Sequence, residues 1–100
     1  MIATGCTCKN TFTFPYNKND VELLFITYQQ SGQTVFEKQI GDCEISDGCV
    51  SVLLTQEETL KLHNKSIVKI QIRVKLTNGN VTKSNVIEAS TDVVLKNEVI

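Results

Sequence analysis

One stretch of the chain, residues 66–77 (SIVKIQIRVKLT), constrains the fold more than any other. Apolar and polar side chains alternate strictly along it, and the apolar members are Val68, Ile70, Ile72, Val74 and Leu76. A period of two predicts a β-strand with one buried and one solvated face, because a helix would spread the same apolar residues around its surface. The buried face of such a sheet needs a second layer to cover it.

A second segment, residues 21–30 (VELLFITYQQ), is apolar on both faces, so we expect a central strand. One face carries Leu24, Ile26 and Tyr28, and the other carries Leu23, Phe25 and Thr27. A sandwich of this size has one interior, so one of these faces must be covered by a terminal segment or by another chain.

Residues 34–40 are expected to return as the partner of this strand after a turn at Ser31-Gly32. A three-residue loop sets Tyr28 opposite Phe36, and it also sets Leu24 opposite Ile40. A two-residue loop would pair apolar with polar side chains instead. Cross-strand apolar contacts therefore favour the three-residue loop.

The rest of the chain alternates short β-prone runs with turn residues. We expect strands at 11–16, 43–46, 49–54 and 81–89, and residues 92–96 could form a last strand at an edge. Pro15 cannot donate to a ladder and marks the first run as an edge strand or a strand end. The turns fall at Asp47-Gly48 and at Asn78-Gly79, where a type I′ turn is expected.

Two irregular features are predicted between these strands. The alternation of the return strand breaks at Val86-Ile87, which indicates a β-bulge. Thr55 followed by Glu58 forms a capping box and predicts a short helix over residues 56–61.

A chain of 100 residues, 41% hydrophobic and 21% charged, predicts one globular domain. We assign residues 1–9 to a loose N-terminal arm and residues 10–100 to an all-β domain. That domain is a two-layer antiparallel sandwich of about seven strands with one short helical turn. The expected core consists of Leu24, Ile26, Tyr28, Phe36, Val50, Val52, Leu54, Leu60, Val68, Ile70, Ile72, Val74 and Ile87.

Charge and hydropathy argue against several classes of function. The formal net charge of −1 offers no electrostatic basis for binding nucleic acid or a membrane surface. No apolar run approaches the roughly 20 residues of a membrane helix. The N-terminal MIATGCTCKN lacks the pattern of a secretory signal, so we expect a cytoplasmic product.

The chemically reactive side chains form no catalytic, cofactor-binding or metal-binding motif. The four cysteines, Cys6, Cys8, Cys43 and Cys49, do not have the C-x₂₋₄-C spacing of structural zinc sites. A two-residue Asp47-Gly48 loop would place Cys43 and Cys49 on opposite faces. The one histidine, His63, lies in a polar loop without an orienting partner. We therefore expect packed or exposed thiols, no metal, no cofactor and no enzyme.

The polar face of residues 66–77 is basic and could meet an acidic partner. Lys69, Arg73 and Lys75 lie on it, with Lys83 nearby, although alternating lysines also suit a plain solvated sheet face. The predicted interaction surface consists of Leu23, Phe25, Lys69, Arg73 and Lys75. We expect a weak homo-oligomer in isolation and firmer docking within a larger assembly.

The order of these segments resembles small Ig-like β-sandwich domains of structural proteins in tailed phages and prophages. It is similar to the N-terminal domain of upper baseplate proteins, in which a G-V-S-V-x-L-T step follows a strand pair. Here that step reads Gly48-Cys49-Val50-Ser51-Val52-Leu53-Leu54-Thr55, with Cys49 inserted into the pattern.

The resemblance covers roughly residues 21–100 and implies a phage virion component of the tail or baseplate type. Such a component would work by protein–protein contacts with other virion or assembly proteins, first in the cytoplasm and then in the virion. The alternative is a small carbohydrate- or ligand-binding module. That alternative is weakened because the chain has no Trp and only Tyr16 and Tyr28 to build an aromatic platform.

Overall fold

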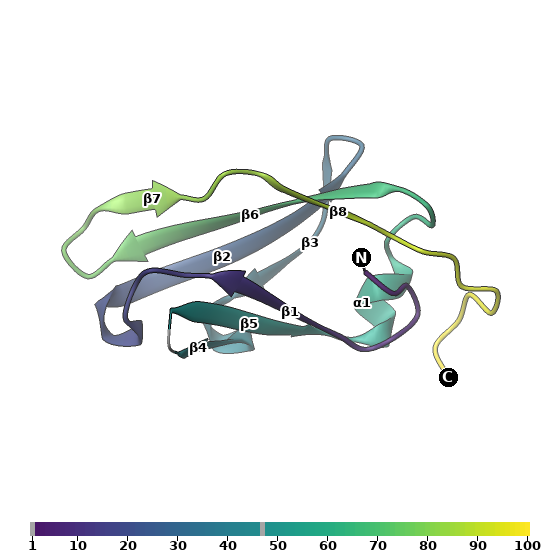
Figure 1. The fold of residues 1–100 in the computed structure, drawn as a ribbon, viewed down its shortest axis with the longest axis horizontal. Coiled ribbons are helices and arrows are strands. Elements are labelled where there is room, and N and C mark those ends of the chain that lie inside the picture. Colours follow the sequence, from purple (N-terminus) through teal and green to yellow (C-terminus); the bar gives the residue numbers. More distant parts are fainter. Residues whose placement is uncertain (1, 47) are drawn as a thin grey trace.

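The computed structural model describes residues 2–46 and 48–100 as two antiparallel sheets packed face to face (Figure 1). The smaller sheet has the order β1 (Cys8–Thr13), β5 (Cys49–Leu54), β4 (Cys43–Ser46). The larger sheet has the order β3 (Gln33–Gln39), β2 (Val21–Gln30), β6 (Ile67–Leu76), and the edge beyond β6 is shared by β7 (Val81–Lys83) and β8 (Ile87–Ser90). The predicted all-β sandwich is confirmed.

The two strand orders match those of an immunoglobulin sandwich. The smaller sheet, β1-β5-β4, has the order of immunoglobulin strands B-E-D. The larger sheet, β3-β2-β6-β7, has the order of strands C′-C-F-G. Within the described residues there are eight strands rather than about seven, because the return strand is divided in two. Two single-turn 3₁₀ helices, η1 (Lys18–Asp20) and η2 (Ile40–Asp42), lie at strand ends.

Strand β6 alternates as its sequence predicts and lines the core with one face. The buried apolar residues are Ile2, Phe14, Val21, Leu24, Ile26, Tyr28, Val50, Val52, Leu54, Leu62, Val68, Ile70, Ile72 and Val74. Three expected core residues differ: Ile87 is 36% exposed, and Phe36 and Leu60 are only partly buried. Leu62, just after the helix, is buried in place of Leu60.

The β2–β3 hairpin reaches the expected register by a different route. Tyr28 does pair with Phe36, but the turn has two residues, Ser31 and Gly32, both with positive φ. A β-bulge at Val35 supplies the missing residue, because Tyr28 pairs with Phe36 while Gln29 pairs with Thr34. The predicted three-residue loop is therefore wrong, although the aromatic pairing that motivated it is correct.

The β6–β7 connection also departs from the expected type I′ turn. The Gly79 amide donates to the Leu76 carbonyl at 2.9 Å, and the Leu76 amide donates to the Asn80 carbonyl at 2.8 Å. Of Asn78 and Gly79, only Gly79 has positive φ, which fits a three-residue loop closed by a glycine bulge.

The predicted irregularity near Val86-Ile87 divides the return strand. Lys83 pairs with Arg73 and Ile87 with Ile70, so four residues of the returning chain oppose three of β6. The Ser84 hydroxyl accepts a hydrogen bond from the Ile72 amide at 3.0 Å and bridges the gap.

Both ends of the chain depart from expectation. The described part of the expected N-terminal arm, residues 2–9, is not loose: Ile2 is buried and bridges Thr91, and β1 begins at Cys8. Thr4 donates its amide to the Asp92 carboxylate at 2.8 Å. Residues 92–96 form no strand and instead run toward the helix. The run predicted at residues 11–16 as an edge strand or a strand end is found as β1, Cys8–Thr13, which lies at an edge of the smaller sheet.

The helix α1 (Gln56–Leu60) begins at the predicted capping box. The Thr55 hydroxyl accepts from the Glu58 amide, while the Glu58 carboxylate accepts from the Thr55 amide at 2.9 Å. The Thr59 hydroxyl donates to the Cys6 carbonyl at 2.9 Å, which ties the N-terminal segment to the helix. Within the described part of the chain, no helix is long and apolar enough to cross a membrane.

Candidate protein–protein interface

The five-stranded sheet has an outer face that faces away from the core, formed mainly by alternate residues of β2 and β6. The register places Leu23 opposite Lys75, Phe25 opposite Arg73, Thr27 opposite Gln71 and Gln29 opposite Lys69. Their neighbours in the sequence, such as Leu24 and Val74, are buried in the core. All five residues predicted as an interaction surface therefore lie on this one face.

Apolar side chains are concentrated at the β7 end of the outer face. Leu23 is 43% exposed, and Phe25 beside it is half-buried. Val81 of β7 pairs with Lys75 and lines a shallow hollow with Leu23 and Phe25. A second hollow of about 360 Å³ extends from Phe25 to Val86. The face thus offers two depressions that share Phe25 and Arg73 and have partly apolar walls.

The charges on the outer face are unevenly paired. Lys75 lies 3.8 Å from the Glu22 carboxylate, and Lys69 pairs with Glu88 in register. Arg73, however, pairs in register with Lys83, and among the described residues neither cation has a carboxylate within ion-pair distance. Like charges directly opposite each other destabilise a strand pair, so this site favours an incoming anion.

Sequence reasoning missed Val81 and Val86 as members of this surface. The type I′ turn expected at Asn78-Gly79 would have paired Val81 with Leu76 on the core side, and only the three-residue loop places it opposite Lys75. Val86 belongs to the irregular segment between β7 and β8, where the alternation of the sequence no longer says which face a residue takes.

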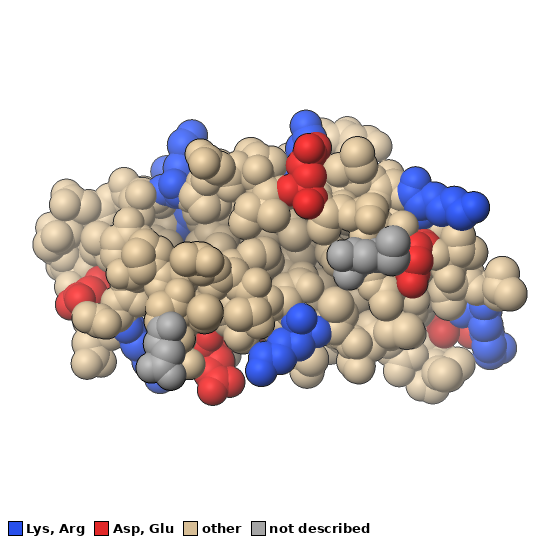
Figure 2. Space-filling view, viewed as in Figure 1, with Lys and Arg blue, Asp and Glu red and all other residues tan. Residues whose placement is uncertain are grey.

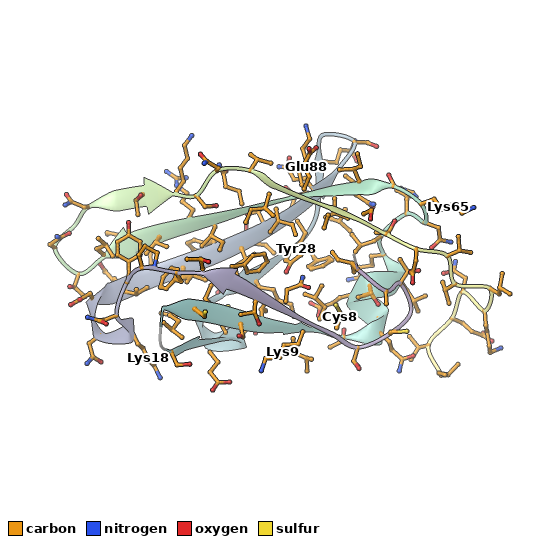
Figure 3. All side chains as sticks on the ribbon, in the orientation of Figure 1. Cys8, Lys9, Lys18, Tyr28, Lys65 and Glu88 are labelled. Carbon is orange, nitrogen blue, oxygen red and sulfur yellow. The ribbon has the colours of Figure 1, made fainter. Side chains whose placement is uncertain are left out.

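The inner side of the same sheet contains a polar link across the core. Tyr28 extends between the two sheets (Figure 3), and its hydroxyl accepts a hydrogen bond from the Asn10 amide at 2.8 Å. Its ring stacks on Phe36 with centroids 4.5 Å apart. Burial raises the pKa of Tyr28 to about 12, although the Asn10 hydrogen bond opposes the rise.

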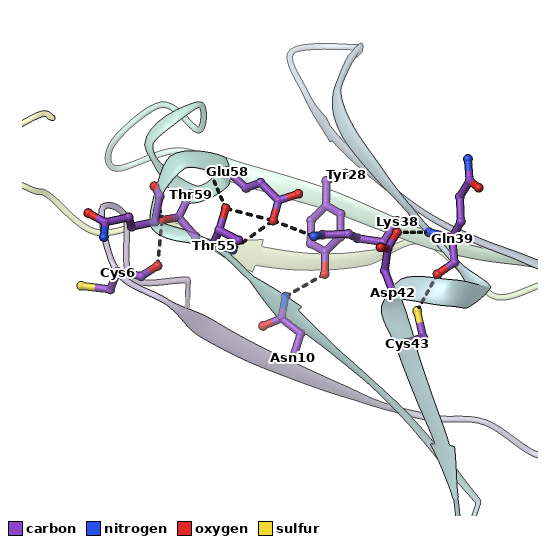
Figure 4. Close-up of polar contacts among 11 residues, drawn as sticks. Cys6, Asn10, Tyr28, Lys38, Gln39, Asp42, Cys43, Thr55, Glu58 and Thr59 are labelled. Carbon is purple, nitrogen blue, oxygen red and sulfur yellow. Dashed lines mark hydrogen bonds and ion pairs between the residues drawn. The ribbon is translucent and has the colours of Figure 1, made fainter. Parts of the chain in front are cut away.

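An ion pair lies beside this link (Figure 4). Lys38, on the inner side of β3, donates to the Glu58 carboxylate at 2.6 Å. Burial alone would raise the pKa of Glu58. Hydrogen bonds from Lys38 and Thr55 outweigh that effect, so the pKa lies below its usual value. One carboxylate therefore caps α1 and ties it to β3.

The cysteines are free thiols in the described structure. Cys43 pairs with Val52 on the core side and Cys49 pairs with Ser46, which confirms the prediction that they face opposite ways. Asp47 of that turn lies outside the described residues. Burial raises the pKa of the Cys43 thiol, Asp42 adds to the rise and Lys38 opposes it.

The other candidate groups are dispersed. In residues 2–46 and 48–100, no three His, Cys, Asp or Glu side chains gather closely enough to hold a metal ion. The His63 side chain is exposed, and the backbone of His63 is held by the Gln30 amide group at 2.7 and 3.3 Å. Figure 2 shows basic and acidic side chains interspersed over the face in view.

Comparison with known proteins adds no family to this description. No protein-family model matches the chain, and a search of the curated proteins finds no match.

Proposed function

We propose that this chain is a non-enzymatic structural or assembly domain of a phage or prophage virion, of the tail or baseplate type. It acts by protein–protein contacts through the outer face of β2 and β6. The observation that carries the proposal is the combination of exposed apolar side chains with the Arg73–Lys83 pair on that face. Apolar patches interrupted by arginine are characteristic of interfaces between proteins.

The rigidity of this surface favours binding. Leu23, Phe25 and Arg73 are side chains of strands that pair on both sides within one sheet. The backbone that carries these side chains is already ordered by pairing in the sheet, so binding requires little further ordering of the main chain.

The virion assignment is supported by the resemblance of the segment order and of residues 48–55 to phage sandwich domains. Under this proposal the chain is present in the cytoplasm during assembly and afterwards in the particle. Its partners are other virion proteins, and copies of itself bind weakly.

The alternative, a carbohydrate-binding module, has less support from the geometry. Such a module needs aromatic rings displayed on its surface. Tyr28 is buried in the core, Tyr16 packs edge-on against Phe14, and Phe25 is one half-buried ring on the outer face.

The proposal is tested on purified particles and on the genes beside this one. We expect flanking genes for tail or capsid proteins, and the chain at fixed stoichiometry in particles by mass spectrometry. Leu23→Glu should prevent incorporation, whereas Leu53→Glu should not. Leu53 is a matched control because it is also an exposed leucine, on a strand of the other sheet. Absence of the chain from particles, or equal incorporation of both variants, would contradict the proposal.

A further inference from the structure

The C-terminal segment, residues 93–100, displays several exposed apolar side chains. Leu95 is 96% exposed and Ile100 is 86% exposed, and Val93 and Val99 are exposed as well. These four residues are a large share of the exposed large hydrophobic side chains in the described structure. Exposed apolar groups gathered in this way mark a surface that binds another protein.

This segment is held in place by specific contacts. Asp92 accepts hydrogen bonds from Thr4, and Val94 packs on Gly5, where an added Cβ would come within 2.9 Å of Val94 Cγ2. The Gln56 side chain donates to the Ile100 carbonyl at 3.0 Å and accepts from the Ile100 amide at 2.8 Å. The apolar side chains are therefore presented on an anchored backbone.

The outer face of the large sheet is chemically complementary to this segment. Leu23, Phe25 and Val81 offer apolar walls, and Arg73 and Lys83 lack a carboxylate partner among the described residues. The segment offers exposed apolar side chains together with Glu98, whose own ion pair with Lys96 is solvent-exposed and therefore weak.

The segment and the outer face of one molecule are too far apart to meet. Ser90 pairs with Ile67, and Arg73 lies six residues further along β6, which is roughly 20 Å at the rise of a strand. Beyond Ser90 the chain runs the other way, toward α1 (Figure 1). A second molecule is needed to bring the two surfaces together.

We propose that residues 93–100 of one copy dock on the outer face of another copy. Glu98 then lies between Arg73 and Lys83, and the segment's apolar side chains cover Leu23, Phe25 and Val81. The proposal rests on the proposed function, because it names a second copy as one partner of the same face. The contact joins two different surfaces, so it either closes by reciprocal exchange in a dimer or propagates along a chain of copies.

Sedimentation equilibrium of the full chain at low salt, over a range of concentrations, tests this contact. We expect concentration-dependent association of the wild type. Arg73→Glu and Glu98→Arg should each raise the dissociation constant by about tenfold, and the double variant should restore association because the ion pair is rebuilt with reversed charges. Lys9→Glu, a charge reversal at an exposed site of the smaller sheet, should leave association unchanged.

Leu95→Asp provides a second variant that cannot act through the core. This side chain is almost fully exposed, so the variant should fold as the wild type does while losing association. A wild type that stays monomeric at millimolar concentration overturns the proposal. Association that is equally strong in Leu95→Asp, Arg73→Glu and Lys9→Glu also overturns it.

A failure of the contact between copies can be distinguished from a failure of the proposed function. If the contact between copies fails but the chain is still found in particles and Leu23→Glu still blocks incorporation, the outer face binds a different virion protein. If the chain associates through residues 93–100 yet is absent from particles, the virion assignment fails while the contact stands.

Discussion

The inner and outer faces of strands β2 and β6 are built from alternating neighbours in the sequence, yet their surroundings differ in almost every respect. Inner residues such as Ile26 and Ile72 are buried, and the polar atoms there have partners: in the described residues, no buried side-chain nitrogen or oxygen lacks a hydrogen bond. Outer residues include half-exposed apolar groups and, among the described residues, cations such as Arg73 that have no carboxylate within ion-pair distance. The difference indicates that the inner face holds the fold and the outer face is available for binding.

The largest expected difference between the faces comes from placing the same acid on each. Ile72→Asp should lower the free energy of unfolding by more than about 3 kcal/mol, because an unpaired charge would be buried. Arg73→Asp, at the next residue, should cost less than about 1 kcal/mol, since it removes a like-charge pair with Lys83. Urea denaturation measures both, and similar losses would show that the faces are assigned incorrectly.

The two ion pairs provide a second comparison. Lys38→Met removes the inner pair with Glu58 and should cost about 2 kcal/mol, because it leaves the partly buried carboxylate of Glu58 without its cation. Lys75→Met removes the outer pair with Glu22 and should cost below about 0.5 kcal/mol. Methionine preserves most of the packing of the lysine stem. If denaturant titration gave equal costs for the two variants, the inner pair would have no special importance.

Hydrogen bonds on the two faces of β2 should also contribute unequally to stability, with the larger contribution on the inner face. Tyr28→Phe leaves the Asn10 amide without its acceptor and should destabilise the domain by about 1 kcal/mol. Thr27→Val removes the bond from the Thr27 hydroxyl to Glu37 on the outer face and should change stability by less than about 0.5 kcal/mol. Thermal and urea denaturation of the two variants measure this difference. A larger loss of stability in Thr27→Val than in Tyr28→Phe would contradict the prediction.

The smallest effect is a dependence on pH. The pKa of Glu58 in the folded chain lies below its unfolded value of about 4.3. Its stabilising contribution is therefore complete above pH of about 5 and is lost as the pH falls through the lower, folded pKa. Wild type should lose more stability between pH 7 and pH 3 than Glu58→Gln does. Parallel curves for the two proteins would mean that Glu58 is not linked to folding.

The sequence predicts the parts of this fold in which the period of two is unbroken. Strand β6, the central position of β2 and the capping box of α1 follow from local patterns, and each is found as expected. The outer-face residues Leu23, Phe25, Lys69, Arg73 and Lys75 are brought together for the same reason, because alternation along two paired strands fixes their common side.

Prediction failed where long-range contacts determine the structure. Ile2 and Thr4 belong to a short polar segment with no periodicity, and they are buried because Thr91 and Asp92, distant in sequence, pair with them. Residues 92–96 have the composition of a strand, but they run toward α1 and form no strand. Ile87, expected in the core, is exposed because one extra residue shifts the register before it.

The bulge at Val35 has a consequence for how sequences of this kind can diverge. Val35 has no partner on β2, and both Val35 and Phe36 pack against the core. Deleting Val35 would leave Thr34 opposite Gln29 and Phe36 opposite Tyr28, so the hairpin would close without turning any side chain over. A natural relative can therefore be one residue shorter here and still keep the aromatic stack. Alignments of such relatives should place their gaps at this position rather than in the turn.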